Sequence, residues 1–297
     1  MRRTLLLLSL CPSAALVALV TGGNKGIGKS IAKQLGGAGW SVILGCRSTA
    51  LGEAAAAELR ASGCSDVVCQ RLDLTDPESI ASTQQYIADS HGQLDALINN
   101  AAICFNDPTL YGKVEHTPFE RQADITVATN YFGTAAVIQA MLPLLRAASA
   151  AGAAGRVVNV ASYAGRLSIL QRAPDKVAVV TAADLRVEQL DELMREFVRD
   201  VEAGVHAKHG WPNTCYGLSK LCLIALTKCL ARDEPSLMVN SVDPGFCATD
   251  QNQNQGYISA DDGAKTPVAL ALLPTDKFAS GKHWYDSEQR ERDWCSM

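Results

Sequence analysis

The sequence lacks the features that mark several large classes of protein. It contains no cluster of lysines and arginines, and its formal net charge is -4, so the basic footprint of a nucleic-acid-binding surface is missing. It has ten cysteines but no CxxC pair, and their irregular spacing is typical of reduced thiols. We therefore expect no nucleic-acid partner, no disulfide framework and no metal site.

The composition also argues against a disordered or membrane-embedded chain. Hydrophobic residues make up 47% and charged residues 20%, close to the averages for soluble globular proteins. Arg2 and Arg3 precede a leucine run that resembles the start of a targeting signal, but the run continues into residues needed for the first strand. We expect residues 1–13 to form an extension of unassigned role and residues 14–297 a single cytoplasmic domain without stable membrane insertion. Organelle targeting is the alternative.

Strands and helices are expected to alternate along the chain. Short apolar runs at residues 16–20, 42–44, 94–98 and 157–160 are typical of parallel strands buried on both faces. Stretches of good helix formers at residues 51–61, 78–90 and 135–148 separate them. This alternation predicts an α/β fold with right-handed crossovers, a doubly wound parallel sheet of the Rossmann type.

A glycine-rich turn follows the first strand, at residues 21–28, and leads into a helix over 29–36. Such a turn holds a pyrophosphate with backbone amides and the positive helix end. NAD-binding sheets place an acid roughly 20 residues further on, but here the second strand ends in Cys46 and Arg47. Without that acid, Arg47 and Lys25 could converge on a 2′-phosphate, which favours NADPH; the alternative is that both are ordinary surface cations.

Six motifs in chain order carry a family resemblance. They are the turn Thr21 to Gly28, Asn99-Asn100-Ala101, Asn130, Ser162, Tyr216 with Lys220, and Pro244-Gly245. The set resembles that of the short-chain dehydrogenases/reductases and covers about residues 15–285. The sequence departs from that family at Ala102, where a glycine is usual, and a methyl group there narrows the space beside the cofactor.

Tyr216 and Lys220 are four residues apart, so on a helix they share one face. A free phenol has a pKa of about 10 and a lysine one of about 10.4. A nearby ammonium favours the phenolate, so we predict that Lys220 lowers the pKa of Tyr216 toward neutrality. The family resemblance implies three further roles: Lys220 binds the nicotinamide ribose, Ser162 steadies the substrate oxygen, and Asn130 holds a water that links Lys220 to solvent.

The cofactor site combines the glycine turn and Arg47 with positions that the resemblance assigns. Asp73 is assigned to the adenine and Thr249 to the nicotinamide side. The complete predicted set is Gly22, Asn24, Lys25, Gly26, Ile27, Gly28, Arg47, Asp73, Leu74, Asn100, Ala101, Tyr216, Lys220, Pro244, Gly245 and Thr249.

The spacing between Ser162 and Tyr216 narrows the family. The two lie 54 positions apart, and the insertion at residues 166–209 is similar to that of monomeric carbonyl reductases and of plant terpenoid and alkaloid ketone reductases. The resemblance implies NADPH-dependent reduction of a ketone, aldehyde or quinone. A plant-type ketone reductase is one alternative. A catalytically silent NADPH-binding regulator is the other, although such a protein would be expected to have lost Tyr216 or Lys220.

Loops at residues 105–111 and 246–257 and the insertion are expected to build the substrate pocket. The insertion also carries a helical apolar stripe, composed of Leu190, Leu193, Met194, Phe197, Val198, Val201 and Val205. We expect it to cover the Tyr216 helix and its neighbour. Because those two helices form the dimer contact in ordinary members of the family, we predict a monomer; the alternative is that the stripe binds a partner helix or a second subunit.

Overall fold

The computed structural model describes residues 15–105, 117–152, 154–272, 274, 277, 279–285 and 290–291. The predicted extension at residues 1–13 and residues 106–111 of the first predicted pocket loop lie outside them.

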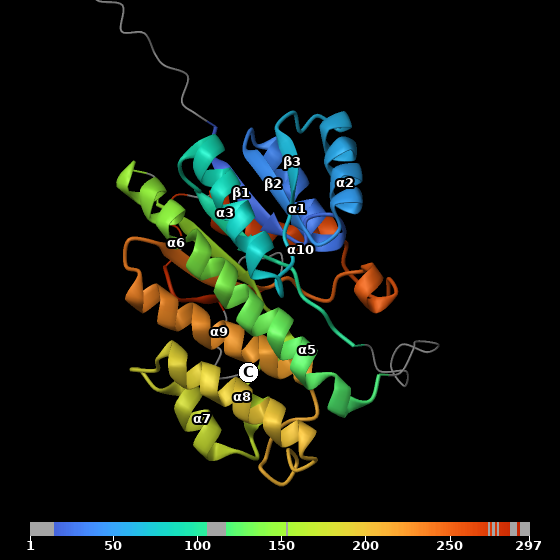
Figure 1. The fold of residues 1–297 in the computed structure, drawn as a ribbon, viewed down its shortest axis with the longest axis vertical. Coiled ribbons are helices and arrows are strands. Elements are labelled where there is room, and N and C mark those ends of the chain that lie inside the picture. The colour runs from blue at the N-terminus through green and yellow to red at the C-terminus, as the bar shows by residue number, and fades with distance from the viewer. Residues whose placement is uncertain are drawn as a thin grey trace, which may run out of the picture.

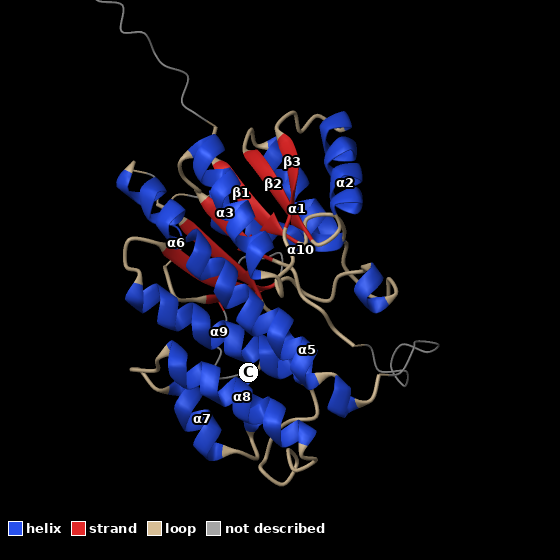
Figure 2. Cartoon of the chain, in the orientation of Figure 1, coloured by secondary structure: helices blue, strands red, loops and turns tan. Residues whose placement is uncertain are grey.

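A single eight-stranded sheet runs through the centre of the molecule (Figures 1 and 2). Its order is β3-β2-β1-β4-β5-β6-β7-β8, and all neighbouring strands are parallel except β7 and β8. The strands are β1 Val17–Thr21, β2 Ser41–Cys46, β3 Val67–Arg71, β4 Ala96–Asn99, β5 Arg156–Val160, β6 Met238–Asp243, β7 His283–Tyr285 and β8 Arg290–Glu291. The predicted doubly wound parallel sheet is confirmed. The chain order reverses at β1, between β2 and β4, and such a switch point opens a crevice at the carboxyl ends of the strands.

Helices cover both faces of the sheet, and their bounds are α1 Gly26–Gly37, α2 Thr49–Ala61, α3 Pro77–His91, α5 Ala123–Val127, α6 Thr134–Ala150, α9 Cys215–Asp233 and α10 Ala260–Leu272. Two apolar cores result. Ala18 and Val20 face one core, with α1, α2 and α10, whereas Leu19 faces the other, with α3, α6 and α9. Because successive strand residues point to opposite faces, burial on both faces explains the continuous apolar runs.

The insertion forms a short η4 turn, Leu167–Leu170, and two helices, α7 Pro174–Thr181 and α8 Val187–Glu202. Five residues of the predicted stripe are buried in α8: Leu190, Leu193, Met194, Phe197 and Val201. The helix packs against α9 and α5, as predicted (Figure 1). A polar contact fixes it there, because the Tyr131 hydroxyl donates to Asp191 Oδ1 at 3.0 Å.

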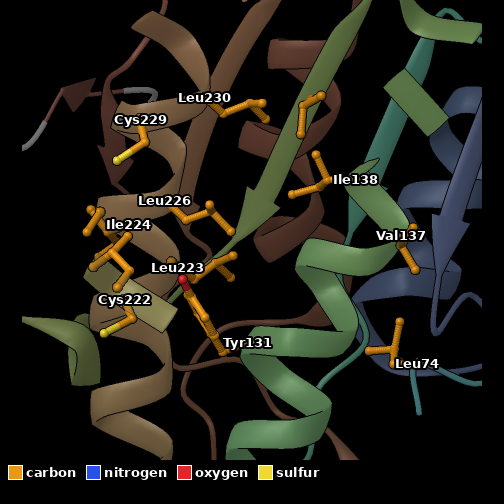
Figure 3. Close-up of a cluster of buried hydrophobic side chains, with 14 of the residues drawn as sticks. Leu74, Tyr131, Val137, Ile138, Cys222, Leu223, Ile224, Leu226, Cys229 and Leu230 are labelled. Carbon is orange, nitrogen blue, oxygen red and sulfur yellow. The ribbon is translucent and has the colours of Figure 1, made fainter. Parts of the chain in front are cut away.

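Tyr131 lies in η2, a π-helical stretch Ala128–Gly133 between α5 and α6. Its ring lies beside Cys222 and Leu223 of α9 in the cluster shown in Figure 3, and it is fully buried. The helical run Ala123–Ala150 is long and apolar enough to span a membrane. However, 56% of its most apolar 18-residue stretch is buried inside the protein. A core helix has the same composition, so this run carries no argument for a membrane span.

Candidate active site

The crevice at the switch point holds a cleft of about 450 Å³. Its wall combines the glycine turn after β1 with the ends of β2, β3 and β4 and a turn after β6. Eleven residues of the predicted cofactor set line it: Gly22, Asn24, Lys25, Gly26, Ile27, Arg47, Asp73, Leu74, Asn100, Ala101 and Thr249. Ala102, the position that departs from the family, lines it too.

The glycine turn is pinned to the end of β4. Asn100 donates from Nδ2 to the carbonyls of Thr21 and Gly22, at 3.0 and 3.3 Å. Helix α1 begins just beyond, with Lys25 at its N-cap and no side chain capping its first amides. A Cβ on Gly28 would lie 2.4 Å from the Gly22 carbonyl oxygen, so only glycine fits this approach. Uncapped amides, a tightly folded loop and a cleft in front of them fit a pyrophosphate.

Gly28→Ala is therefore expected to displace the turn. Overpacking of this kind costs about 1–3 kcal/mol, and we expect the Kd for NADPH to rise at least about tenfold. The measurement is a fluorescence titration of the folded variant with NADPH. Gly37→Ala provides the control. Gly37 lies in the same helix, and a Cβ there would meet nothing within 4 Å. Equal Kd values for Gly28→Ala and Gly37→Ala would contradict the assignment.

Two cations, Lys25 and Arg47, line the cleft. Arg47 follows β2 directly and is exposed, and no acid occupies the end of that strand. Lys25 Nζ pairs with Asp250 Oδ2 at 3.3 Å, a contact that links the glycine turn to the turn after β6. Both partners are about two-thirds exposed, so the pair is weak and a bound phosphate could exchange with the carboxylate.

Asp73, which the sequence analysis assigns to the adenine, is held in a defined orientation. Its Oδ1 accepts hydrogen bonds from the backbone amide and the hydroxyl of Thr75, at 3.0 and 2.8 Å. Its own amide donates to Ser79 Oγ at 3.0 Å. The carboxylate and Leu74 therefore form a fixed part of the cleft wall.

Tyr216 lies in the first turn of α9. Thr214 caps this helix by accepting from the Gly217 amide at 2.9 Å. A Cβ on Gly217 would come within 2.8 Å of the Ala164 carbonyl oxygen, so the helix packs closely on η3, Tyr163–Gly165. This approach brings Tyr216 next to Ser162, which precedes η3, and the side chains of Ser162 and Gln251 both oppose the rise that burial causes in the pKa of the Tyr216 phenol.

Lys220 lies one turn further along α9 and faces the same way. Its Nζ is 5.6 Å from the centre of the Tyr216 ring and donates to the Val160 carbonyl at 2.7 Å. The predicted effect on Tyr216 is wrong for this structure: burial raises the pKa of the Tyr216 phenol, and Lys220 is not among the groups that offset it. Burial also lowers the pKa of Lys220, to about 8, because both groups lose water together.

The lowered pKa of Lys220 predicts a pH dependence. Lys220 carries its ammonium below about pH 8 and loses it above. We expect kcat/KM for NADPH, which reports the free enzyme, to be level below that pH and to fall about tenfold per pH unit above it. For Lys220→Met, kcat/KM for NADPH should be lower at every pH and should not fall above about pH 8. A wild-type profile that stays level to about pH 10 would contradict the role of the ammonium.

Asn130 is buried at the point where η2 passes the end of β4. Its Oδ1 accepts from the Ile103 amide at 2.8 Å, and its Nδ2 donates to the Ile103 carbonyl at 2.9 Å and to Ser219 Oγ at 3.1 Å. The side chain thus ties the segment after β4 to α9. These bonds use both Nδ2 protons and one lone pair of Oδ1, so a water linked to Lys220 could still donate to the second lone pair of Oδ1.

Five residues of the predicted cofactor set do not line the cleft itself: Gly28, Tyr216, Lys220, Pro244 and Gly245. Gly28 lies behind the turn, and Pro244 and Gly245 form the bend after β6, where Gly245 has φ 81°. Among the residues that the structure describes, no three histidine, cysteine or acidic side chains gather as metal ligands do.

Sequence reasoning missed two residues at this site. Gln251 belongs to the predicted pocket loop at residues 246–257, but nothing in the sequence singled it out from its neighbours. Cys104 follows the β4 motif and interacts electrostatically with both Tyr216 and Lys220, and burial raises its pKa to about 11. Both depend on where loops place side chains.

Comparisons with known proteins agree with the geometry. Residues 16–174 match the family model of the short chain dehydrogenases. Carbonyl reductase (NADPH) 1 of Pongo abelii is 38% identical over 288 residues, covering 94% of this chain and 98% of the relative. Among solved structures, salutaridine reductase from Papaver somniferum has a TM-score of 0.82 at 31% identity, covering 91% of this chain and 99% of its own. Menthone neomenthol reductase from Mentha piperita has a TM-score of 0.77 at 30% identity, and the match covers 92% of this chain and 99% of that structure's chain.

Proposed function

The chain belongs to the short-chain dehydrogenase family, and we propose that it catalyses the NADPH-dependent reduction of a ketone, aldehyde or quinone carbonyl to the alcohol. The observation that carries this proposal is the placement of Tyr216, Ser162 and Lys220 together beside a cleft that fits a dinucleotide. Full-length relatives named as NADPH carbonyl reductases support it.

NADPH, when bound, supplies the hydride that adds to the carbonyl carbon. The residues of the chain handle the oxygen and the proton. Ser162 hydrogen-bonds the carbonyl oxygen and stabilises the negative charge that develops there. Tyr216 donates its phenolic proton to that oxygen, and its raised pKa keeps the phenol protonated until this step. Hydride and proton together convert C=O to CH–OH.

Lys220 and Asn130 support the reaction without contacting the carbonyl oxygen. The Lys220 ammonium lies 5.6 Å from the centre of the Tyr216 ring, and we assign it to the nicotinamide ribose. Asn130 holds the end of β4 against α9, so that the cofactor cleft and the Tyr216 helix keep their spacing. A water held at Asn130 would return a proton to Lys220.

Two alternatives differ in their consequences. A plant-type terpenoid or alkaloid ketone reductase would use the same residues on a different substrate, and the likeness to salutaridine reductase favours this only in part. A catalytically silent regulator would bind NADPH without turning over. The intact Ser162, Tyr216 and Lys220 favour an enzyme. The oxidation of NADPH in the presence of quinones, diketones, ketones and aldehydes, followed by absorbance, separates the regulator from the enzymes and ranks the substrate classes.

We also propose that the protein is a monomer. Helices α7 and α8 pack across α9, and α8 covers α5, so the surface that the family uses for dimerisation is occupied within the chain. Light scattering at micromolar concentration is expected to give a mass near 31.6 kDa. A stable dimer or tetramer would instead assign the insertion to a subunit contact.

The proposed location is the cytoplasm. The cysteines in the described part of the chain are free, and most are buried, which suits a reducing compartment. The measurement is fractionation of cells that express the full chain or a chain without residues 1–13, each with the same C-terminal tag. Both should be recovered in the soluble fraction, and retention of only the full chain in an organelle would support the targeting alternative.

A further inference from the structure

Two segments that line the cofactor cleft are in contact with each other. The glycine turn contributes Lys25 and Gly26 to the cleft wall, and the turn after β6 contributes Thr249 and Asp250. Lys25 Nζ donates to Asp250 Oδ2 at 3.3 Å. A Cβ on Gly26 would lie 3.4 Å from Thr249 Cγ2, which is ordinary van der Waals contact. The turn after β6 therefore lies directly against the turn that fits the cofactor phosphates.

The Asp250 end of this contact is held more firmly than the Lys25 end. Asp250 begins η5, Asp250–Asn252, and Asn252 is 8% exposed. Asn252 Oδ1 accepts from the Thr249 amide at 3.1 Å, and its Nδ2 donates to the Cys247 carbonyl at 2.8 Å. Lys25, in contrast, carries its ammonium on a flexible four-carbon chain. The pair is therefore broken most readily by a movement of the Lys25 side chain, while Asp250 stays in place.

Lys25 has a second partner in the proposed function. Together with Arg47 it is assigned to the 2′-phosphate of NADPH, and NADH has a hydroxyl in that place. A phosphate monoester carries about 1.5 to 2 negative charges at pH 7, whereas a carboxylate carries one, so the phosphate is the stronger partner for the ammonium. NADPH therefore draws Lys25 away from Asp250, and NADH leaves the pair intact. Binding of NADPH has to break one ion pair that binding of NADH does not.

The effect of this ion pair on cofactor binding is modest and measurable. The side chains of Lys25 and Asp250 are 65% and 68% exposed, and exposed pairs of this kind change an equilibrium constant at most about fivefold. Only cofactors that need Lys25 are affected, so the pair changes the preference between cofactors and not the general affinity of the cleft.

We propose that Asp250 determines cofactor selectivity: its carboxylate competes with the 2′-phosphate of NADPH for Lys25, and it weakens the binding of NADPH relative to that of NADH. This inference rests on the proposed use of NADPH and deepens it, because it gives the turn after β6 a role in the choice of cofactor. Asp250 acts through Lys25 and is a positioning residue. A moderated affinity also helps the oxidised cofactor to leave after each turnover.

The test measures the Kd values of NADPH and NADH by fluorescence titration, and the quantity of interest is the NADH value divided by the NADPH value. Asp250→Asn keeps the size of the side chain and removes its charge. We expect it to raise this ratio about two- to fivefold, because Lys25 loses its competing partner. Asp261→Asn is the matched control and should leave the ratio unchanged. Asp261 pairs with Lys33 at 3.5 Å, both side chains are more than half exposed, and neither lines the cleft.

A double-mutant comparison separates competition for Lys25 from simple repulsion between Asp250 and the phosphate. In Lys25→Met the ammonium is gone, so the addition of Asp250→Asn should leave the ratio close to that of Lys25→Met alone. An equal rise of the ratio in both backgrounds would show that Asp250 acts by its charge alone, and it would overturn the inference.

A second pair of ligands tests the contact without turnover. In 2′-AMP the phosphate occupies the position that distinguishes NADPH, whereas in 5′-AMP it occupies the pyrophosphate position. Calorimetric titration should show that Asp250→Asn tightens the binding of 2′-AMP about two- to fivefold and hardly changes that of 5′-AMP.

The outcomes distinguish this inference from the proposed function. An unchanged ratio in Asp250→Asn, with a wild type that prefers NADPH and reduces a carbonyl, overturns the inference and leaves the proposed function standing. A ratio that rises as expected in a protein that reduces no carbonyl supports the competition and contradicts the proposed function. If the wild type binds NADPH no better than NADH, the proposed cofactor is wrong and the inference fails with it.

Discussion

Replacing Tyr216 with phenylalanine is expected to lower kcat by about two to four orders of magnitude, the range that a positioned general acid contributes. The Kd for NADPH should hardly change, because the ring remains and only the hydroxyl is lost. Burial raises the pKa of this phenol, so the wild-type group is protonated throughout the neutral range and serves as a donor. Single-turnover kinetics with saturating NADPH measure the chemical step directly.

Tyr163 provides a matched control for this substitution. It lies in η3 one residue after Ser162, is 51% exposed, and its ring faces Arg166 with the guanidinium carbon 5.0 Å from its centre. Tyr163→Phe removes the same hydroxyl from a residue near the site and should leave kcat close to that of the wild type. If Tyr216→Phe retained more than about a tenth of wild-type kcat, Tyr216 would not be the proton donor.

Arg47→Asp is expected to weaken NADPH binding by about one to two orders of magnitude. The change removes a charge-assisted contact to the 2′-phosphate and places a carboxylate where that phosphate must lie. NADH has a free ribose hydroxyl at this position, which a carboxylate accepts well, so its Kd should change far less. Titration of wild type and variant with both cofactors gives the four constants required.

Arg121→Asp is the control for charge alone, since Arg121 is exposed in η1, Phe119–Arg121, and does not line the cleft. It should leave both cofactor affinities unchanged. A wild-type protein that binds and uses NADH as well as NADPH would show that Arg47 and Lys25 do not select the 2′-phosphate.

The framework of the fold could be predicted because its signals are local. The continuous apolar run at β1 follows from burial on both faces of the sheet, and the glycine turn follows from the close approach at Gly28. The apolar stripe of α8 could be predicted from the sequence because helical spacing places its buried residues on one face. The contact that anchors this helix, between Tyr131 and Asp191, joins residues 60 apart, and no pattern in the sequence pairs them.

The site was predictable in its residues but less so in its electrostatics. Helical spacing placed Tyr216 and Lys220 on one face, yet the predicted lowering of the phenol pKa was wrong, because burial raises that pKa and Lys220 is not among the groups that oppose the rise. Desolvation depends on the loops and helices that close around both groups. Gln251 lines the cleft from the turn after β6, and the placement of such a turn leaves no periodic signal in the sequence.

Transfer of hydrogen to a defined carbon tests the central claim most directly. The protein is incubated with a reducible carbonyl and NADPH deuterated at the transferable position of the nicotinamide, and the products are analysed by mass spectrometry. The proposed function predicts an alcohol that carries one deuterium on its carbinol carbon for each NADPH consumed, and almost none with Tyr216→Phe. Tight binding of NADPH with no deuterated alcohol from any of the diketones, ketones and aldehydes, and with no oxidation of NADPH by the quinones, would contradict it and identify the protein as a binding regulator.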